Sequence, residues 1–341
     1  INALIAEELQ VKKSQVDAAV ELLDEGNTIP FIARYRKEVT GGLDDDALRV
    51  LGERLEYLRG LEDRKQTVLS TIEEAGALTD ELRKKIDAAR TLAEVEDIYR
   101  PYKPKRRTRA TIAKEKGLEP LAETIKAQQL KTSLTEEAEK YVDPENDVHV
   151  PEDAINGACD IIAEEISDNA DFRSWIREKT KTDGNISSAQ KKENTPSVYE
   201  MYYDYSEKIT TIPGHRILAM NRGEKEDFLT VKVNAPAEDI ARYLEKQIIT
   251  SENPNTTPAL QSAAKDAYDR LIAPSIEREI RSDLTEMAED GAIKVFAANL
   301  RQLLLAPPIA GKTVLGWDPG YVHGCKLAVC DPTGKILTTD M

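Results

Sequence analysis

The sequence predicts a mainly α-helical protein with a small amount of β structure. Aromatic residues make up only 5% of the 341 residues, and Ala, Leu, Glu, Lys and Arg dominate. Apolar residues recur every three or four positions from Leu48 to Ile72, which is the spacing of one helix face. A run without proline from Ser275 to Leu305 predicts a long central helix of roughly 45 Å.

Residues 1–130 are predicted to form an N-terminal helical region. Thr28 caps a short helix that has Pro30 near its first turn and changes from apolar to basic. The acids at positions 44–46 are favourably placed at the N-terminus of the following long helix. Three cysteines form no disulfide framework, and no run approaches 18 apolar residues. With no signal-peptide pattern, these features predict a reducing cytoplasm and no membrane association.

Residues 131–195 are predicted to be helical and similar to a helix-turn-helix, followed by a polar loop from Gly184 to Thr195. One helix begins at Pro151 and runs to Ile166, and a second runs from Asn169 to Thr180. The second carries basic residues that would suit a DNA-recognition helix. They are Arg173, Arg177, Lys179 and Lys181. Ordinary packing of two helices as a hairpin is the favoured alternative.

Residues 196–306 are predicted to hold a tyrosine-rich segment, a small β-hairpin and the long central helix. The tyrosines between Tyr199 and Tyr205 have helical spacing and favour packing against a neighbouring element. The hairpin pairs residues 216–220 with residues 228–233. The apolar stripe of the long helix widens after Val295, which predicts more burial towards its C-terminal end.

The densest basic segment lies between Tyr99 and Arg109 and contains no acid. Its six cations are Arg100, Lys103, Lys105, Arg106, Arg107 and Arg109. Pro101 and Pro104 predict an extended backbone, and two tyrosines interleave. The net charge is −15, so the whole molecule is not expected to attract nucleic acid, and binding requires a local basic patch. The segment either contacts phosphates or neutralises the acidic helices around it.

Residues 307–341 are predicted to form three short strands joined by tight turns. The strands are residues 313–318, 325–330 and a third beginning at Lys335, and the short loops predict an antiparallel meander. Asp318 ends the first strand and precedes Pro-Gly, which resembles the opening of RNase H-like domains such as Holliday-junction resolvases. There the first-strand Asp helps hold a divalent metal. The alternative is that Asp318 only caps a tight turn.

Four stretches resemble the bacterial Tex (transcription accessory protein) family. They read TIPFIARYRKEVTGGLDD from Thr28, DIYRPYKPKRRTRA from Asp97, DYSEKITTIPGHRILAMNRGEKE from Asp204 and LLLAPPIAGKTVLGWDPGYVHGCKLAVCD from Leu303. The resemblance implies a helical N-terminal region, a helix-turn-helix-like part, a long central helix and the start of a YqgF-type RNase H-like α/β domain. The chain, which begins at Ile1 and ends within a strand, is therefore expected to be part of a longer protein. Helix-hairpin-helix repeats and an OB-fold RNA-binding domain would follow Met341.

Two functions remain open for such a protein. The first is a non-catalytic transcription scaffold that binds RNA or DNA, mainly through the domains expected after Met341, and contacts the transcription machinery. The second is a metal-dependent nuclease in which Asp318 is the first ligand of Mg²⁺. Two-metal chemistry needs several converging carboxylates, and this stretch supplies one. The favoured prediction is the scaffold without cofactor or bound metal.

Overall fold

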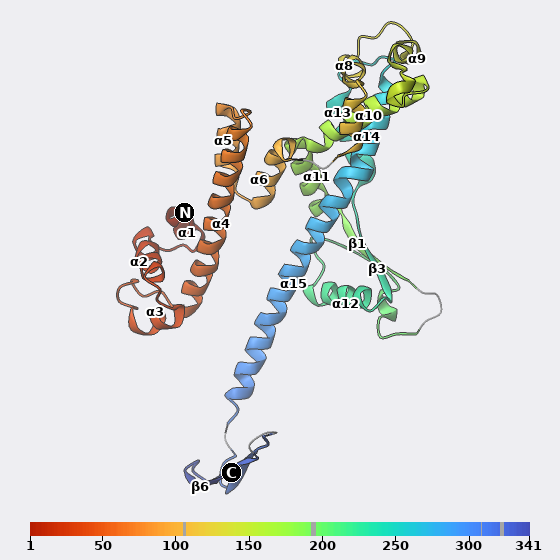
Figure 1. The fold of residues 1–341 in the computed structure, drawn as a ribbon. Helices are drawn as coiled ribbons and strands as arrows, with labels where there is room; N and C mark the ends of the chain where they lie inside the picture. The colour runs from red at the N-terminus through yellow and green to blue at the C-terminus, as the bar shows by residue number, and fades with distance from the viewer. Residues whose placement is uncertain (105–106, 192–195, 308, 321–323) are drawn as a thin grey trace. The chain divides into compact units, whose positions relative to one another are not determined.

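The computed structural model confirms a mainly helical chain with small sheets (Figure 1). It describes residues 1–104, 107–191, 196–307, 309–320 and 324–341. The chain divides into two compact units: Ile1–Asn185 with Val233–Arg278, and Ile186–Lys232 with Glu279–Met341. The division predicted at residues 130, 195 and 306 stays a prediction. Within the described ranges, no helix is long and apolar enough to cross a membrane.

The first unit begins with six helices that share one hydrophobic core. They are α1 Asn2–Glu8, α2 Lys13–Asp24, α3 Ile29–Tyr35, α4 Asp45–Glu74, α5 Asp80–Ala88 and α6 Leu92–Tyr99. The predicted start of α4 is confirmed, since the Asp44 side chain accepts a hydrogen bond from the backbone N–H of Ala47. The apolar positions from Leu48 to Ile72 are buried and make α4 the main wall of this core.

The rest of the first unit packs around α10, Pro151–Asp168. The other helices there are α7 Arg109–Glu115, α8 Glu119–Ala127, α9 Leu134–Ala138, α11 Ala170–Asp183, α13 Ala237–Ile248 and α14 Thr257–Asp266. Short 3₁₀ turns lie between them at Arg100–Tyr102, Glu139–Tyr141 and Pro144–Asn146. Gly157 on α10 lies against buried Leu118, and a Cβ added there would be 2.3 Å from Leu118 Cδ1. The absent side chain therefore allows the close approach of the chain before α8 to α10.

A buried ion-pair cluster joins α6 to α11. Asp97 on α6 accepts hydrogen bonds from Arg173 Nε and Arg177 Nη2, and all three residues are at most 6% exposed. Arg173 Nη2 also donates to Ser275 Oγ at 2.7 Å. Burial lowers the pKa of the Arg173 guanidinium, while Asp97 opposes that shift. One carboxylate thus holds two buried cations in place, which is a costly arrangement unless its geometry is kept.

The predicted long helix is confirmed as α15, Ala273–Leu304. It follows α14 through a π-helical turn, Ala267–Ile272. Pro274 lies one residue into α15 and has no N–H to donate to a carbonyl four residues earlier. The wider π turn directly before it accommodates this missing bond without ending the helix.

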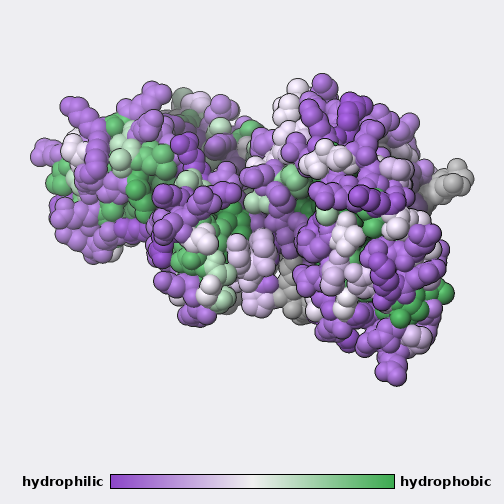
Figure 2. Space-filling model, turned by 90° about the horizontal axis from the view of Figure 1, so that it is seen from above, coloured by the Kyte–Doolittle hydropathy of each residue, from purple (hydrophilic) through white to green (hydrophobic). Residues whose placement is uncertain are grey.

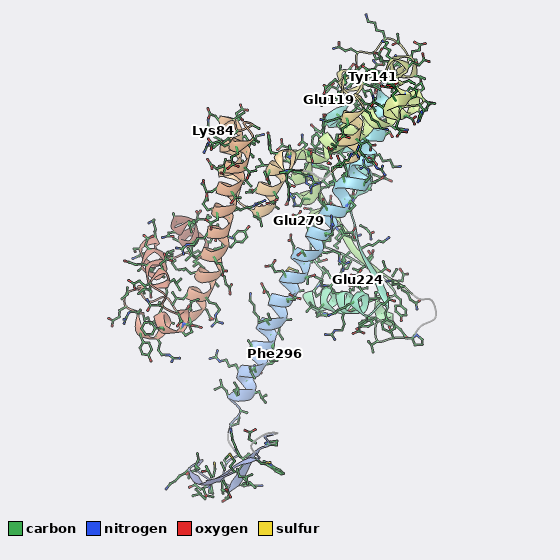
Figure 3. The ribbon with its side chains drawn as sticks, viewed as in Figure 1. Lys84, Glu119, Tyr141, Glu224, Glu279 and Phe296 are labelled. Carbon is green, nitrogen blue, oxygen red and sulfur yellow. The ribbon has the colours of Figure 1, made fainter. Side chains whose placement is uncertain are left out.

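In the second unit, the prediction that α15 becomes more buried towards its C-terminal end is wrong. Leu284 and Ala288 are buried, whereas Phe296 is 67% exposed and Leu303 is 73% exposed. Figure 3 marks the position of Phe296 on this half of α15. The apolar stripe gives the helical period but does not say how far a neighbouring element extends along it.

The element that covers the buried part of α15 is α12, Gly214–Lys225. A Cβ on Gly214 would lie 3.0 Å from Ala288 Cα, so the two backbones approach closely. Arg281 Nη2 donates to Glu224 Oε2 at 2.6 Å. The predicted hairpin is wrong, because residues 216–220 belong to this helix. Ile217 and Met220 are buried three residues apart, which is a helical spacing.

A three-stranded sheet in the order β2-β1-β3 stands in place of the hairpin. Its strands are β1 Asn185–Gln190, β2 Asp204–Lys208 and β3 Leu229–Asn234. The polar sequence of β1 predicts a loop, but Ile186 and Ser188 are buried in alternation. The tyrosines precede or enter β2 and lack the predicted helical arrangement, although Tyr199 and Tyr202 are buried as the packing prediction requires.

The three predicted C-terminal strands are confirmed as an antiparallel meander. They are β4 Val314–Asp318, β5 Lys326–Cys330 and β6 Ile336–Asp340. Asp331 makes the turn after β5, where its carboxylate accepts hydrogen bonds from the backbone N–H groups of Thr333 and Lys335. The Thr333 hydroxyl is the main cause that lowers the pKa of Asp331.

We expect Asp97→Asn to reduce the free energy of unfolding by about 3–5 kcal/mol, because it removes the buried carboxylate charge that Arg173 and Arg177 share. Urea unfolding at pH 7 measures this change. Asp63→Asn is the matched control, since Asp63 is exposed on α4 and such changes stay within about 0.5 kcal/mol. Equal stability of the two variants would contradict the role assigned to Asp97.

Two glycine substitutions should have opposite signs. Gly157→Ala is expected to cost about 1–3 kcal/mol, because buried Leu118 must move. Gly60→Ala meets no atom within 4 Å and should stabilise α4 by up to about 1 kcal/mol through helix propensity. Thermal and urea unfolding of both variants test this. A neutral Gly157→Ala would show that the region around Leu118 repacks freely.

Candidate nucleic-acid interface

The predicted basic segment connects α6 to α7. Thr91 and Glu94 form a capping box at the start of α6, and Thr108 caps α7 through the backbone N–H of Thr111. The extended backbone predicted here is wrong for Arg100–Tyr102, which forms a 3₁₀ turn. Pro101 fits that turn because a first-turn residue needs no N–H donor.

Buried contacts fix the beginning of the segment. Tyr99 is 7% exposed, and the guanidinium carbon of Arg64 lies 5.4 Å from its ring centroid. Arg64 also donates to Glu96 at 2.6 Å. The cations that follow Tyr99 therefore begin from a rigid part of the first unit.

Three of the predicted binding residues lie within 4 Å of carboxylates. Arg100 lies 3.2 Å from Asp168, Lys103 lies 3.9 Å from Glu96, and Arg107 lies 2.8 Å from Glu115. Lys105 and Arg106 are outside the described residues. These contacts fit the neutralising alternative. The exposed pairs of Lys103 and Arg107 contribute only about 0–1 kcal/mol each, so they leave phosphate binding open as well.

Arg109 is the first residue of α7 and faces a second group of charged residues. It lines a pocket of about 330 Å³ together with Lys116, His149 and Asp160. Burial raises the pKa of Asp160, while Arg270 and Arg109 act to lower it. The predicted set is therefore divided: Arg109 faces α10, and the other described cations lie along the turn.

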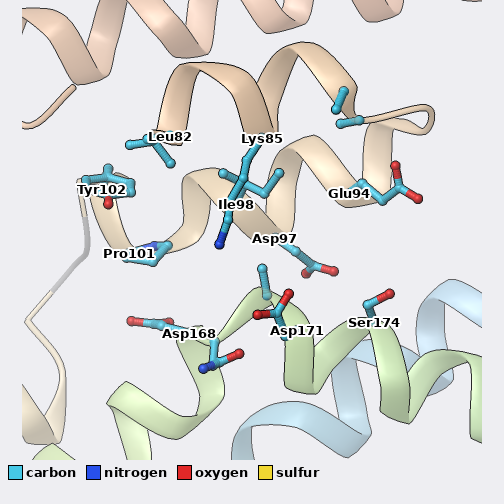
Figure 4. A pocket seen from close by; sticks show the side chains of 14 residues that line it. Leu82, Lys85, Glu94, Asp97, Ile98, Pro101, Tyr102, Asp168, Asp171 and Ser174 are labelled. Atoms are coloured by element: carbon cyan, nitrogen blue, oxygen red, sulfur yellow. The ribbon is translucent and has the colours of Figure 1, made fainter. Parts of the chain in front are cut away.

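A pocket of about 500 Å³ lies beside the basic segment, between α5 and α6 on one side and the α10–α11 junction on the other (Figure 4). Pro101 and Tyr102 contribute to its wall. Its charged lining residues are Lys85, Glu94, Asp97, Asp168 and Asp171. Four carboxylates against one ammonium group would repel a phosphate. Any nucleic acid on the basic segment would therefore lie outside this pocket.

The helix-turn-helix prediction does not give a DNA-reading surface at Arg173 and Arg177. Both side chains are buried on Asp97. Lys179 lies 2.6 Å from Asp183 and 2.9 Å from Asp239. The sequence predicts basic residues on this helix, but it does not show that Asp97 on α6 forms buried ion pairs with two of them.

Asp318 lies where the sequence predicts, at the end of β4. It pairs in register with Lys326 of β5 and is exposed. Across the described part of the chain, no three His, Cys, Asp or Glu residues gather as a metal site. The residues described around Asp318 do not by themselves fit a two-metal centre.

One exposed basic group was missed as a site by sequence reasoning. Arg34, Arg36 and Lys37 follow the buried Ile32 of α3 and are exposed. The signal was present, since basic Arg34 and Arg36 flank the aromatic Tyr35 and Lys37 follows them directly. On the face of the molecule shown in Figure 2, hydrophilic residues dominate and hydrophobic ones form small patches between them.

Three family models match successive parts of the chain, and relatives align with it over almost its whole length. Residues 1–73 match the Tex-like protein N-terminal domain, residues 130–296 the Tex central region and residues 312–341 the Tex protein YqgF-like domain. The chain is 50% identical to the uncharacterized protein YdcI of Bacillus subtilis, over 99% of this chain and 47% of that protein. It is 41% identical to the transcriptional accessory protein Tex of Neisseria gonorrhoeae, over 99% of this chain and 45% of that protein.

A human relative is 34% identical over 94% of this chain and 34% of its own length, and it is named S1 RNA-binding domain-containing protein 1. The chain thus spans about half the length, or less, of the curated relatives it matches. Models from one family match most of the residues, and the relatives align over almost all of them. The chain belongs to the Tex family.

Proposed function

We propose that this chain is the helical part of a non-catalytic scaffold that binds nucleic acid during transcription. The names of two relatives support this proposal, one as a transcriptional accessory protein and one by its S1 RNA-binding domain. The whole protein would bind RNA or DNA, mainly through domains beyond this chain, and would contact the transcription machinery.

The basic segment is the observation that carries the local part of the proposal. It places six cations within ten residues of a chain whose net charge is −15. The two ends of the segment are held in place, because Tyr99 before it is buried and the Thr108 hydroxyl caps α7. The ion pairs of Lys103 and Arg107 are surface pairs that phosphates can replace at low cost. The pair of Arg100 with Asp168 is partly buried. Binding should therefore be weak, independent of sequence and strongly salt-dependent.

The scaffold role is supported by how the first unit is built. The core around α4, the packing on α10 and the Asp97 cluster are all made of buried contacts. Such contacts hold helices in a fixed register and leave few buried groups with reactive chemistry. Cys159 is an example, since burial raises the pKa of its thiol to about 11 and keeps it protonated and unreactive.

A metal-dependent nuclease is the alternative function. It would use Asp318 and Mg²⁺, and it requires further carboxylates to converge on the end of β4. Asp318 is exposed at the predicted strand end, which is the observation that favours it. Since one carboxylate is in place among the described residues, we propose no reaction step for this chain.

If all six cations contact phosphates, the slope of log K against log salt should be about −4 to −5. The double variant Arg106→Glu with Arg107→Glu should make that slope shallower by about 2 and weaken binding at least tenfold at 0.1 M salt. Fluorescence anisotropy with labelled 20-nucleotide RNA and DNA measures both quantities.

The matched control is Lys84→Glu with Lys131→Glu, two exposed lysines outside the segment. It changes the net charge equally and should leave the slope within about 0.5 of the original value. Unaltered binding by the Arg106 and Arg107 variant would remove the basic segment from the proposal.

The nuclease alternative predicts that the full-length protein cuts branched or single-stranded DNA or RNA with Mg²⁺ or Mn²⁺. Asp318→Asn should then abolish cleavage, because the amide loses the charge that holds the metal. Gel assays with each of these substrates measure the cleavage. We expect no cleavage by the wild-type protein, and Asp318-dependent cleavage would replace the scaffold proposal with an enzymatic one.

A further inference from the structure

A second cationic surface lies at the end of α3, far in sequence from the basic segment. We call it the α3 tip. It consists of Phe31, Arg34, Tyr35, Arg36, Lys37 and Val39. All of these residues except Phe31 are exposed, with Tyr35 at 61% and Val39 at 56%.

The α3 tip is held rigidly by buried residues on either side of it. Ile32 is fully buried, and so is Thr40. The Thr40 hydroxyl donates to the carbonyl of Lys37 at 3.2 Å, and the backbone N–H of Gly42 donates to the same carbonyl at 2.8 Å. Gln15 Nε2 on α2 donates to the carbonyl of Gly41 at 2.9 Å. The exposed side chains therefore project from a fixed backbone, so binding a ligand costs little backbone conformational entropy.

The cations of the α3 tip have no carboxylate partner among the described residues. No acidic oxygen lies within 4 Å of Arg34, Arg36 or Lys37, and the adjacent Glu38 pairs with none of them. Arg36 Nη1 donates to the carbonyl of Tyr35. Elsewhere, as at Arg54 with Glu8 and Arg59 with Asp24, exposed arginines of the same core carry bidentate acidic partners. Three neighbouring cations without acids favour an anionic ligand.

Two aromatic rings lie among these cations. The centroids of Phe31 and Tyr35 are 5.3 Å apart, and the guanidinium carbon of Arg36 lies 5.2 Å from the Phe31 centroid. An exposed ring offers a face on which an unpaired base can stack, and cations beside it can contact the flanking phosphates. A duplex hides its base faces, so this combination suits a single strand better.

We propose that the α3 tip is a binding site for single-stranded nucleic acid. Arg34, Arg36 and Lys37 contact its phosphates, and Tyr35 stacks on a base. The inference deepens the proposed function, on which it rests, by adding a contact that is separate from the basic segment. An acidic peptide would use the charges but not the ring, and that difference separates the two ligands in solution.

The test uses the 341-residue chain and labelled 20-nucleotide oligo(U) and oligo(dT) in anisotropy titrations from 50 to 300 mM salt. One variant combines Arg34→Ser, Arg36→Ser and Lys37→Ser, and a second is Tyr35→Ala. The matched control combines Lys84→Ser, Lys131→Ser and Lys246→Ser, three exposed lysines of the same unit without acidic partners among the described residues. All changed side chains are exposed, and circular dichroism with urea unfolding verifies that each variant is folded.

We expect the triple variant of the α3 tip to make the salt slope shallower by about 2, since each single-strand phosphate contact contributes about 0.7. Tyr35→Ala should weaken binding at least about fivefold with the slope unchanged, because it removes stacking and no charge. The control should change affinity less than about twofold. Oligonucleotides with 4-thiouridine should crosslink to the peptide that contains Phe31 and Tyr35.

Three results would overturn the inference. Wild-type binding with the α3 tip variants equal to the control would remove this site alone and leave the basic segment as the contact. Competition by polyglutamate as strong as that by oligo(U) at equal charge, with no effect of Tyr35→Ala, would identify a general site for acidic chains. Absence of binding by the wild-type chain would instead overturn this inference together with the local part of the proposed function, which is binding by the basic segment.

Discussion

The buried contact of Asp97 with Arg173 and Arg177 is the constraint on which the first unit depends. Asp97 lies on α6 and the two arginines on α11, and Arg173 reaches Ser275 near the start of α15. Removing charges from water is so costly that only a tightly matched arrangement is tolerated. The cluster therefore specifies how segments about 75 and 100 residues apart in sequence come together.

Because Arg173 and Arg177 are buried on Asp97, they are not available to bind a partner, and other cations must make such contacts. Basic residues on α11 look like a recognition surface when only the helix is considered, yet two of them neutralise one buried acid. Among the described residues, exposed cations that lie close together in sequence include Lys103, Arg107 and Arg109 of the basic segment and those of the α3 tip. In an acidic molecule such local groups decide where an anion binds, since the overall field repels it.

The sequence predicts the helical class, the long α4 and α15 helices and the terminal meander well, because strong periodicity and turn residues are local signals. It fails where packing decides. The strand β1 looks like a polar loop, residues 216–220 look like a strand, and the exposed half of α15 looks like core. In each case the neighbouring element that covers a face is distant in sequence. About half of the candidate site could be predicted: the cations of the basic segment are evident, but their carboxylate partners are not.

The sequence by itself determined the family, the positions of the basic segment and the place of Asp318 at a strand end. These features follow from residue types in short stretches and need no knowledge of distant contacts. Only the tertiary structure decided that Arg173 and Arg177 are buried, and that Arg34, Arg36 and Lys37 project without acidic partners among the described residues. The physical reason is that burial and ion pairing depend on which side chains come into contact in the folded chain, and the spacing of residues in the sequence does not give these contacts.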